Sequence, residues 1–355
     1  MAKKSKNSPI FELSKPWDSN TNPIWLGTAL KLYRNVDKFS FPGKLSTDRR
    51  KQILSLIKKA ITNCNKLSNP VIINAEDTSP NEKEYLFEHF LSMHGFHQAH
   101  EGEALVFDDS NSVLGVLNIR DHLQLQAIDT TGEIEQAWNN LIAIEMAIGQ
   151  EVTYAFNDSY GFLTADPATC GTGMVIYAFL QVPALIHAGS LSTILSKHSL
   201  EGIASTGLQG DPNHLIGDVV VLYNSCTLGM TEENTVTMLR SALTRLFIEE
   251  KSARSKIRED SDSHFKDHVS RAFGLLMHSY QTETVEALNA ISLLKLGLEL
   301  EWIGGTSIEA LNRLFFGCRR GHLLARSTEE LDSDVVLHKR AELIHKTLKS
   351  AKLKI

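Results

Sequence analysis

The chain has 355 residues, 42% of them hydrophobic and 22% charged, which is ordinary for a globular protein of one or two domains. Its 36 lysines and arginines against 42 aspartates and glutamates give a net charge of −6, which argues against a general nucleic-acid-binding protein. No apolar run is long enough to span a membrane, and the basic start Met1–Asn7 is not followed by the apolar segment of a secretory signal. We therefore expect no membrane insertion, and a flexible tail over residues 1–20.

The cysteines and histidines favour neither a disulfide framework nor a metal site. The four cysteines are scattered and none forms a closely spaced pair, which is typical of a reducing, cytoplasmic location. His94, His97 and His100 are three residues apart, as on one face of a helix, but Gly95 and Phe96 suggest that the helix ends there. We therefore expect no bound metal.

Periodicity predicts a mixture of helices and strands up to about residue 258. Helices are expected over residues 47–63, 82–94, 133–148 and 232–256. Strands are expected from Ala104, Val113 and His122, and over 152–156 and 216–225. The apolar segment 172–187 is predicted to be a buried helix that Pro183 kinks or ends.

The pattern changes near residues 259–263, beyond which no strand pattern remains. Four amphipathic segments predict helices over 266–279, 283–298, 307–316 and 337–349. We therefore place a first domain at 21–258 and an all-helical domain at 264–350.

The segment 161–185 has the layout of a phosphate-handling turn without the charges that such a turn needs. Gly171-Thr172-Gly173 is a small, flexible turn that would let backbone N–H groups approach a ligand. However, no arginine or lysine occurs between Gly161 and Leu185, whereas a polyphosphate site normally includes cations.

Taken in order and spacing, a series of short segments resembles the phosphagen kinases and, within them, the bacterial protein arginine kinases. The resemblance implies an α+β fold, with a phosphagen-kinase-like antiparallel sheet flanked by helices and a helical dimerisation domain after it. The segments are 32–36 with 39–42, 121–122, 154–157 with 161–164, 171–173, 183–185, 217–218, 227–229, 250–254 and 340–344.

In that family, arginines clamp the phosphates during ATP-dependent transfer to a guanidinium group. The resemblance places the five arginine positions at Ala29, Lys31, Gln124, Val175 and Thr206, so that only Lys31 is cationic. A single transition-state arginine can contribute a factor of about 10³–10⁵ to the rate, and lysine lacks the bidentate fork of arginine. A shift in register would restore Arg34 at most.

Further family residues are replaced, including both glutamates of one motif. A glutamate becomes Arg120, which reverses the charge that a guanidinium substrate needs; a cysteine becomes Asp166; and a glutamate is shortened to Asp211. Arg120 could form a small-anion pocket with Lys31, or pair with Asp121 or Asp166.

Asp211 and Cys170 each have a functional and a structural interpretation. Asp211 could act as a general base on a mobile loop or be a solvated loop acid. Cys170 could be a reactive thiol or fill a tight turn. We expect His122 to be structural.

These substitutions predict a catalytically inactive homologue, a pseudokinase that works as a binding or adaptor protein without a cofactor. The alternative is an active phosphotransferase with a rebuilt site, using ATP and magnesium. By resemblance, the partner would be a zinc-binding activator-like protein or a component of a Clp system, and the C-terminal helices would form a homodimer. The family's phosphoarginine-sensing motif is incomplete at 336–341, where its leading Arg-Asp pair is absent.

Overall fold

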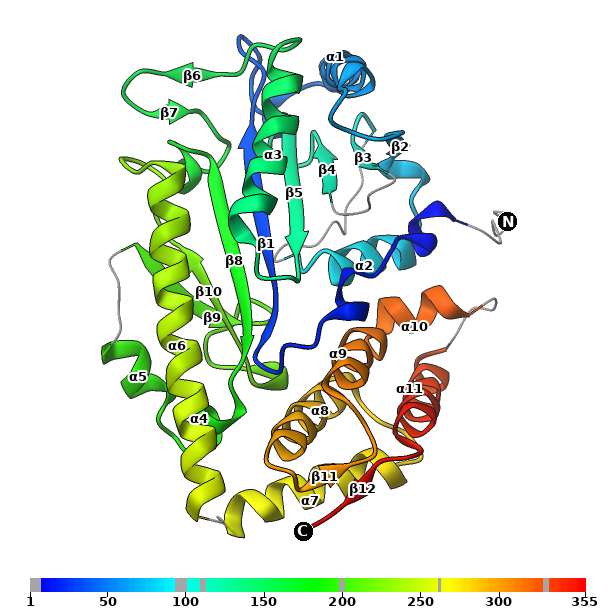
Figure 1. Ribbon diagram of the computed structural model, residues 1–355. Coiled ribbons are helices and arrows are strands. Elements are labelled where there is room, and N and C mark those ends of the chain that lie inside the picture. The colour runs from blue at the N-terminus through cyan, green and yellow to red at the C-terminus, as the bar shows by residue number, and fades with distance from the viewer. Residues whose placement is uncertain (1–7, 93–100, 109–112, 198–201, 261–262, 328–331) are drawn as a thin grey trace.

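The computed structural model describes residues 8–92, 101–108, 113–197, 202–260, 263–327 and 332–355 (Figure 1). Its centre is an eight-stranded sheet in the order β2-β3-β4-β5-β1-β8-β10-β9, in which every neighbouring pair is antiparallel. This arrangement confirms the predicted α+β fold. The strands are β1 (Trp25–Arg34), β2 (Val71–Asn74), β3 (Ala104–Phe107), β4 (Val113–Leu117), β5 (Leu123–Asp129), β8 (Met174–Gln181), β9 (Ile203–Gly207) and β10 (Val219–Asn224).

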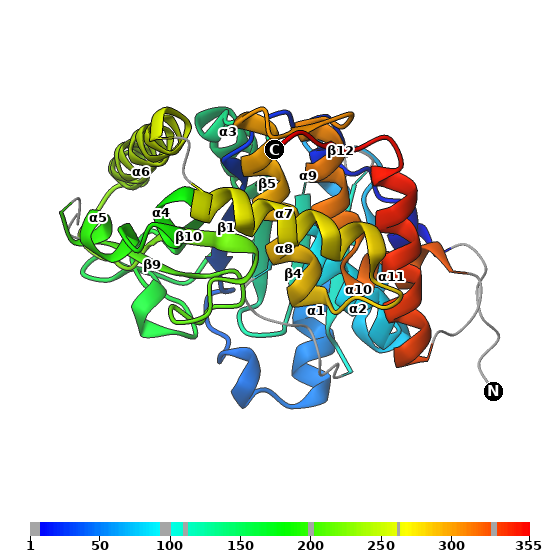
Figure 2. The ribbon, with the colours of Figure 1, turned by 90° about the horizontal axis from the view of Figure 1, so that it is seen from below.

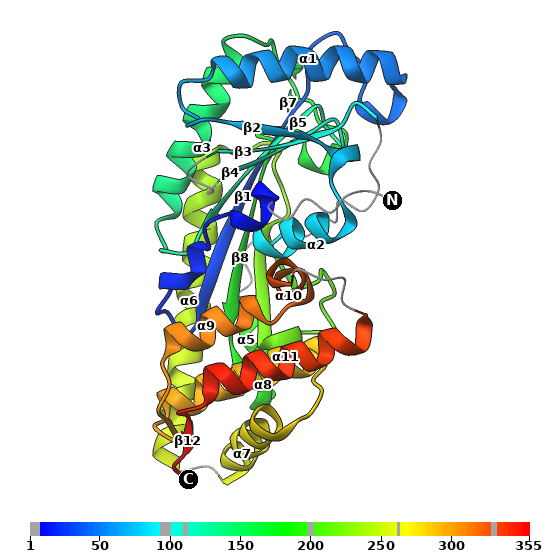
Figure 3. The same cartoon turned by 90° about the vertical axis from the view of Figure 1, so that its right-hand side faces the viewer.

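Helices cover both faces of the sheet (Figure 3). We call the two faces the α3 face and the α8 face, after one helix that packs on each. The α3 face carries α1 (Thr47–Asn63), α3 (Ile134–Gly149) and α6 (Glu232–Asp260). The α8 face carries α2 (Pro80–His89) and the C-terminal helices α7 (Ser263–His278), α8 (Thr284–Glu299), α9 (Ile308–Gly317), α10 (Arg320–Arg326) and α11 (Ser333–Leu348).

Most of the strongly periodic segments form the predicted elements. The helix expected over 47–63 is α1, and α3, α6 and strands β3, β4, β5 and β10 lie within a few residues of their predicted bounds. The strand expected over 152–156 is reduced to a bridge between Tyr154 and Val36 and a small hairpin of β6 (Phe156–Asn157) with β7 (Gly161–Phe162). The predicted helix 82–94 corresponds to α2, which ends at His89. Residues 93 and 94 of the predicted range lie outside the described part of the chain.

The prediction of a buried helix over 172–187 is wrong. Residues Met174–Gln181 form β8, which pairs with β1 on one side and β10 on the other. A continuous apolar run is equally compatible with a strand buried on both faces, and the β-branched and aromatic residues of this segment favour the strand. Pro183 does not kink a helix but begins the short helix α4 (Pro183–His187).

The termini also differ from expectation. Within the predicted flexible tail, residues 8–20 form two 3-10 helices, Pro9–Glu12 and Pro16–Ser19, and bury Ile10 and Trp17 in the core of the α8 face. The C-terminal half contains the unpredicted helix α10 and a pair of two-residue strands, β11 (Ile303–Gly304) and β12 (Lys352–Leu353). These strands pair residues that are distant in sequence, so local periodicity gives no signal for them.

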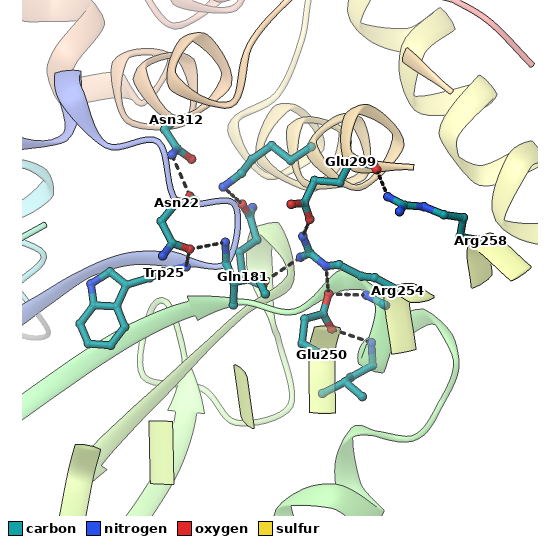
Figure 4. Close-up of polar contacts among 12 residues, drawn as sticks. Asn22, Trp25, Gln181, Glu250, Arg254, Arg258, Glu299 and Asn312 are labelled. Atoms are coloured by element: carbon teal, nitrogen blue, oxygen red, sulfur yellow. Dashed lines mark hydrogen bonds and ion pairs between the residues drawn. The ribbon is translucent and has the colours of Figure 1, made fainter. Parts of the chain in front are cut away.

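The C-terminal helices pack against the sheet (Figure 2), and polar contacts form a seam between them (Figure 4). The buried Lys295 of α8 donates to Gln181 Oε1 of β8 at 2.6 Å, and Gln181 Nε2 donates to Gly217 O at 2.7 Å. Arg254 of α6 donates to Glu250 Oε1 at 2.6 Å and also pairs with Glu299 of α8. The predicted boundary near 259–263 falls between α6 and α7, but the two halves of the chain share one hydrophobic core. None of the described helices is long and apolar enough to cross a membrane.

Candidate functional site

Four of the five predicted arginine positions lie close together on the α8 face. Lys31 of β1 is directly opposite Val175 of β8, and Tyr33, two residues further along β1, is opposite Gln124 of β5. Because side chains alternate along a strand and opposite residues share a face, Ala29, Lys31, Gln124 and Val175 point to the same side. The motif order in the sequence therefore identified a real spatial cluster.

Thr206 is separate from this cluster. It lies on the edge strand β9 opposite Val221, which is in turn opposite Phe179 of β8. Two strand spacings, about 10 Å, separate β9 from β8, and Phe179 is four residues along β8 from Val175. No strand was predicted at the position of β9, so this separation was not predicted.

Lys31, the only cation among the five, is buried and has only 2% of its surface exposed. Its Nζ lies 5.1 Å from the ring centroid of Tyr177, a cation–π contact. Burial, reinforced by the nearby Arg120 charge, lowers the pKa of Lys31 to about 7. Lys31 is therefore only partly charged at neutral pH and is covered by an aromatic ring.

The tyrosines around Lys31 were missed at the sequence level. Tyr177 stacks on Tyr223 of β10 with ring centroids 5.5 Å apart, and Tyr33 is 6% exposed. Burial, and to a lesser extent the neighbouring Tyr223, raises the pKa of Tyr177 to about 12. Burial also raises the pKa of Tyr33. Their shared orientation is visible only once 174–181 is recognised as a strand, because alternation then places Val175 and Tyr177 on one face.

Arg120 pairs with Asp166, as one of the two interpretations predicted. Arg120 Nη2 lies 2.7 Å from Asp166 Oδ2, and both side chains are partly exposed. The neighbouring Asp121 is buried and accepts from Asn35 Nδ2 at 2.6 Å and from Ala165 N at 2.7 Å. Burial raises the pKa of Asp121, although these hydrogen bonds act in the opposite direction. The charge-reversed position therefore has a counterion within the protein.

The Gly171-Thr172-Gly173 turn directs its backbone toward the protein. Gly171 N donates to Phe162 O, Thr172 N donates to Thr227 O, and Met174 N donates to the Thr172 hydroxyl. Gly171 has φ +107°, and a Cβ there would lie 2.3 Å from Thr227 O, so only glycine fits. These three amide groups are already used and do not form a phosphate cradle.

Arg34 does not replace a lost clamp residue. It points away from the cluster, is 1% exposed, and its Nε lies 2.6 Å from Glu145 Oε1 of α3. Its Nη1 donates to Thr172 O at 2.9 Å and its guanidinium lies 3.5 Å from the Phe162 ring centroid. Arg34 therefore ties the turn to the α3 face.

The remaining candidates have structural surroundings. Asp211 is half-exposed in a loop, with its Oδ2 2.5 Å from His214 Nδ1, and this contact lowers the pKa of Asp211. His122 Nδ1 accepts from Val36 N at 2.9 Å and its Nε2 lies 3.0 Å from Ser40 O, while burial lowers its pKa to about 4. Cys170 packs in the turn with its Sγ 3.4 Å from the Thr164 hydroxyl.

The remnant of the sensing motif on α11 also has structural contacts. Arg340 is 1% exposed and donates through Nε to Cys318 O at 2.8 Å and through Nη1 to Thr282 O at 2.7 Å. Its guanidinium therefore holds three parts of the C-terminal half together.

Within the described ranges, no three histidine, cysteine, aspartate or glutamate side chains are grouped so that they could hold a metal ion. His94, His97 and His100 lie outside those ranges. The surroundings of the cluster do not fit a magnesium–polyphosphate group either, because Lys31 is covered and Arg120 is paired.

Family models and curated relatives match most of the chain. The ATP:guanido phosphotransferase C-terminal catalytic domain matches residues 52–253, and the protein-arginine kinase McsB C-terminal domain matches residues 262–354. A protein-arginine kinase of Chlamydia pneumoniae is 33% identical over 336 residues, 92% of each chain. One of Halothermothrix orenii is 28% identical, over 92% of this chain and 95% of the relative.

Solved structures agree on the fold. A lombricine kinase superposes with a TM-score of 0.56 at 16% identity, over 70% of this chain and 71% of the other. The duplicated taurocyamine kinase of Schistosoma mansoni superposes with a TM-score of 0.57 at 22% identity, over 64% of this chain and about a third (33%) of that longer chain. The chain therefore belongs to the ATP:guanido phosphotransferase family, within the group of the protein-arginine kinases.

Proposed function

We propose that this chain is a catalytically inactive member of its family, which keeps the fold and acts as a cytoplasmic binding or adaptor protein. The observation that carries the proposal is the condition of Lys31. It is the one cation left among the five arginine positions, and it is buried beneath Tyr177 with a pKa lowered to about 7. Phosphoryl transfer depends mainly on positioning and electrostatic stabilisation, which this group cannot provide to a polyphosphate.

Two neighbouring features support the same conclusion. Arg120 is neutralised by Asp166, and the Gly171 and Thr172 amides of the turn are bonded to Phe162 O and Thr227 O. A nucleotide would have to break these contacts before it gained any of its own. We propose that the conserved architecture serves recognition of a partner protein, with homodimerisation through the C-terminal helices; a zinc-binding activator-like protein or a Clp component is the first candidate for the partner.

A phosphoarginine assay tests the loss of catalysis. The full chain is incubated with magnesium-ATP and an arginine-rich acceptor protein, and acid-labile phosphate is measured beside an active protein-arginine kinase. We expect no signal above that of a heat-inactivated sample. Turnover comparable to the active enzyme would establish the alternative, an active phosphotransferase with a rebuilt nucleotide site.

Ligand binding gives a second readout that does not depend on the acceptor. A ligand that binds only the folded state raises its stability in proportion to the logarithm of its concentration. We expect magnesium-ATP to leave the thermal unfolding midpoint of this chain unchanged and to raise that of the active relative.

A further inference from the structure

Strand β9 forms one edge of the sheet and leaves part of its backbone unpaired. Ser225 N donates to Gly202 O at 2.8 Å, so by the antiparallel alternation Ala204 and Thr206 direct their backbone groups toward β10. Ile203 and Ser205 then direct their backbone N–H and C=O groups outward, and these groups have no hydrogen-bond partner among the described residues. Gly207 N donates to Asp211 O, which closes the edge at that end. The open edge is therefore short and centred on Ser205.

This edge lacks the protection that sheet edges usually carry. Charged side chains and prolines normally discourage another strand from pairing, but Ile203–Gly207 contains neither. At the opposite edge, β2 follows Pro70, and Lys58 Nζ donates to Asn74 Oδ1 at the end of the strand, at 2.8 Å. The two edges are thus not equivalent, and β9 is the more receptive one.

A mostly apolar pocket of about 330 Å³ lies beside β9. Residues of α4, the short helix α5 (Leu191–Lys197), the loop before β10, and β9 and β10 themselves line the pocket. Figure 1 shows these helices and strands at one side of the sheet. Alternation directs the Ser205 side chain toward the face of Leu222, on the same side as the pocket. The main apolar residues that line the pocket are Ile186, Leu191, Leu195, Leu215 and Val220.

The charges near the pocket favour a basic partner at one end. Asp211 is 46% exposed and its pKa is lowered by His214, so it carries a negative charge at neutral pH. On the other side, Lys197 of α5 is already paired with Glu249 at 3.3 Å.

We propose that the edge of β9 and this pocket together bind an extended segment of a partner protein, which adds a strand to the sheet, inserts an aliphatic side chain into the pocket and places a basic residue near Asp211. In this mode of recognition, main-chain hydrogen bonds supply affinity and a pocket for alternate side chains supplies specificity. The inference rests on the proposed binding function and names the chemistry of the partner. A free apolar molecule would fill the pocket but leave the backbone groups of Ser205 unpaired.

The test uses the full chain and a fluorescein-labelled peptide, acetyl-Lys-Val-Ser-Val-Ser-Lys-amide, with binding measured by fluorescence anisotropy. A second peptide carries N-methyl groups on alternate residues, which removes the donors needed for strand pairing. Ser205→Pro removes the outward N–H, which an edge strand tolerates, and Leu195→Asp places a charge in the pocket. Ile72→Pro is the matched control, because Ala75 N donates to Glu103 O and Ile72 therefore faces outward on β2.

We expect Ser205→Pro and Leu195→Asp each to weaken binding of the peptide by at least about tenfold. The N-methylated peptide should bind the unmodified chain at least about tenfold more weakly than the unmethylated peptide does, and Ile72→Pro should bind the peptide like the unmodified chain. The inference is overturned if the peptide does not bind up to about 1 mM, if N-methylation has no effect, or if Ile72→Pro weakens binding as much as Ser205→Pro. If Ser205→Pro fails to fold, Leu195→Asp and the N-methylated peptide decide. The phosphoarginine assay is independent, so phosphotransfer would refute the proposed function, whereas absent peptide binding refutes only this inference.

Discussion

The seam between the two halves of the chain and the cluster around Lys31 differ in how their cationic side chains are paired. In the seam, Arg254 is enclosed by Glu250, Glu299 and the carbonyl of Gln181, and Lys295 donates to Gln181 Oε1 (Figure 4). At the cluster, three of four arginine positions are uncharged and Lys31 faces a tyrosine ring. In the seam, protein atoms satisfy the cationic side chains. At the cluster, a bound ligand would have to satisfy them, and most of the positions carry no cation.

The comparison separates what holds the fold together from what performs the chemistry. A buried guanidinium is tolerated when carboxylates and carbonyls surround it, as they do for Arg34, Arg254 and Arg340. An arginine whose partner is a bound phosphate has no such support in the free protein. Under the proposed loss of catalysis, nothing in the fold requires such an arginine, and the architecture does not depend on it.

The largest effect is expected in the seam. Arg254→Ala leaves Glu250 buried without its counterion, so we expect a loss of about 3–5 kcal/mol in the free energy of unfolding. Urea titration followed by circular dichroism measures it. The control is Arg271→Ala, which removes an exposed pair with Asp267 and should have no measurable effect. A loss in Arg254→Ala as small as in the control would show that the seam contributes little to stability.

A second contact between the halves should depend on pH. His89 of α2 and His322 of α10 are buried with ring centroids 6.0 Å apart. Burial, with the nearby Arg319 and Lys15 charges, lowers the pKa of His89 to about 3 and that of His322 in the same direction. Unfolded histidine has a pKa near 6.5, so the unfolded chain binds protons first as the pH falls.

The stabilisation from these two histidines is therefore complete above about pH 6.5 and is lost as the pH falls toward 3. Between pH 6.5 and 5 we expect a loss of about 2 kcal/mol in the free energy of unfolding from His89, and a further loss in the same direction from His322. Urea titrations across this range measure the slope, and the double substitution of His89 and His322 by phenylalanine should flatten it. His278→Phe, at an exposed position, should keep the slope of the unmodified chain. An unchanged slope in the double variant would assign the acid sensitivity to other groups.

The sequence predicted the elements with strong periodicity better than it predicted the surroundings of the candidate site. Helices α1, α3 and α6 followed from spacing alone, because each has one apolar face. Strand β8 could not be predicted from spacing, because a run of residues that is apolar on both faces shows no hydrophobic periodicity. The clustering of Ala29, Lys31, Gln124 and Val175 followed from motif order.

What covers that cluster depends on register and could not be predicted. The position of Tyr177 over Lys31 requires β8 to be a strand, and the distance of Thr206 requires the unpredicted β9. The pairing of Arg120 with Asp166 was one of two open interpretations, because each residue lies in a loop and loop geometry is not encoded in periodicity.

A substitution at Lys31 sharpens the contrast with the seam. No acidic group among the described residues opposes the fall in its pKa, so Lys31→Met should raise the free energy of unfolding by about 1–4 kcal/mol at pH 7. Lys295→Met is the comparison, and it should gain less because it leaves Gln181 Oε1 without its donor. The stability of the unmodified chain should also rise as the pH increases from 7 toward 10, because the unfolded lysine keeps its proton there and the folded one does not. Destabilisation by Lys31→Met would mean that the ammonium has a favourable role at the cluster.

The smallest effect concerns Thr206, whose hydroxyl is buried and has no hydrogen-bond partner among the described residues. Thr206→Val keeps the shape and removes the unpaired group, so we expect a gain of about 1 kcal/mol in the free energy of unfolding. Thr227→Val is the matched control: the Thr227 hydroxyl donates to Cys170 O at 2.5 Å and Ala168 O at 3.0 Å, and its loss should destabilise by about 1 kcal/mol. If Thr206→Val instead lost stability, the Thr206 hydroxyl would have a hydrogen-bond partner such as bound water. This position on β9, one of the five arginine positions, would then still bind a polar group.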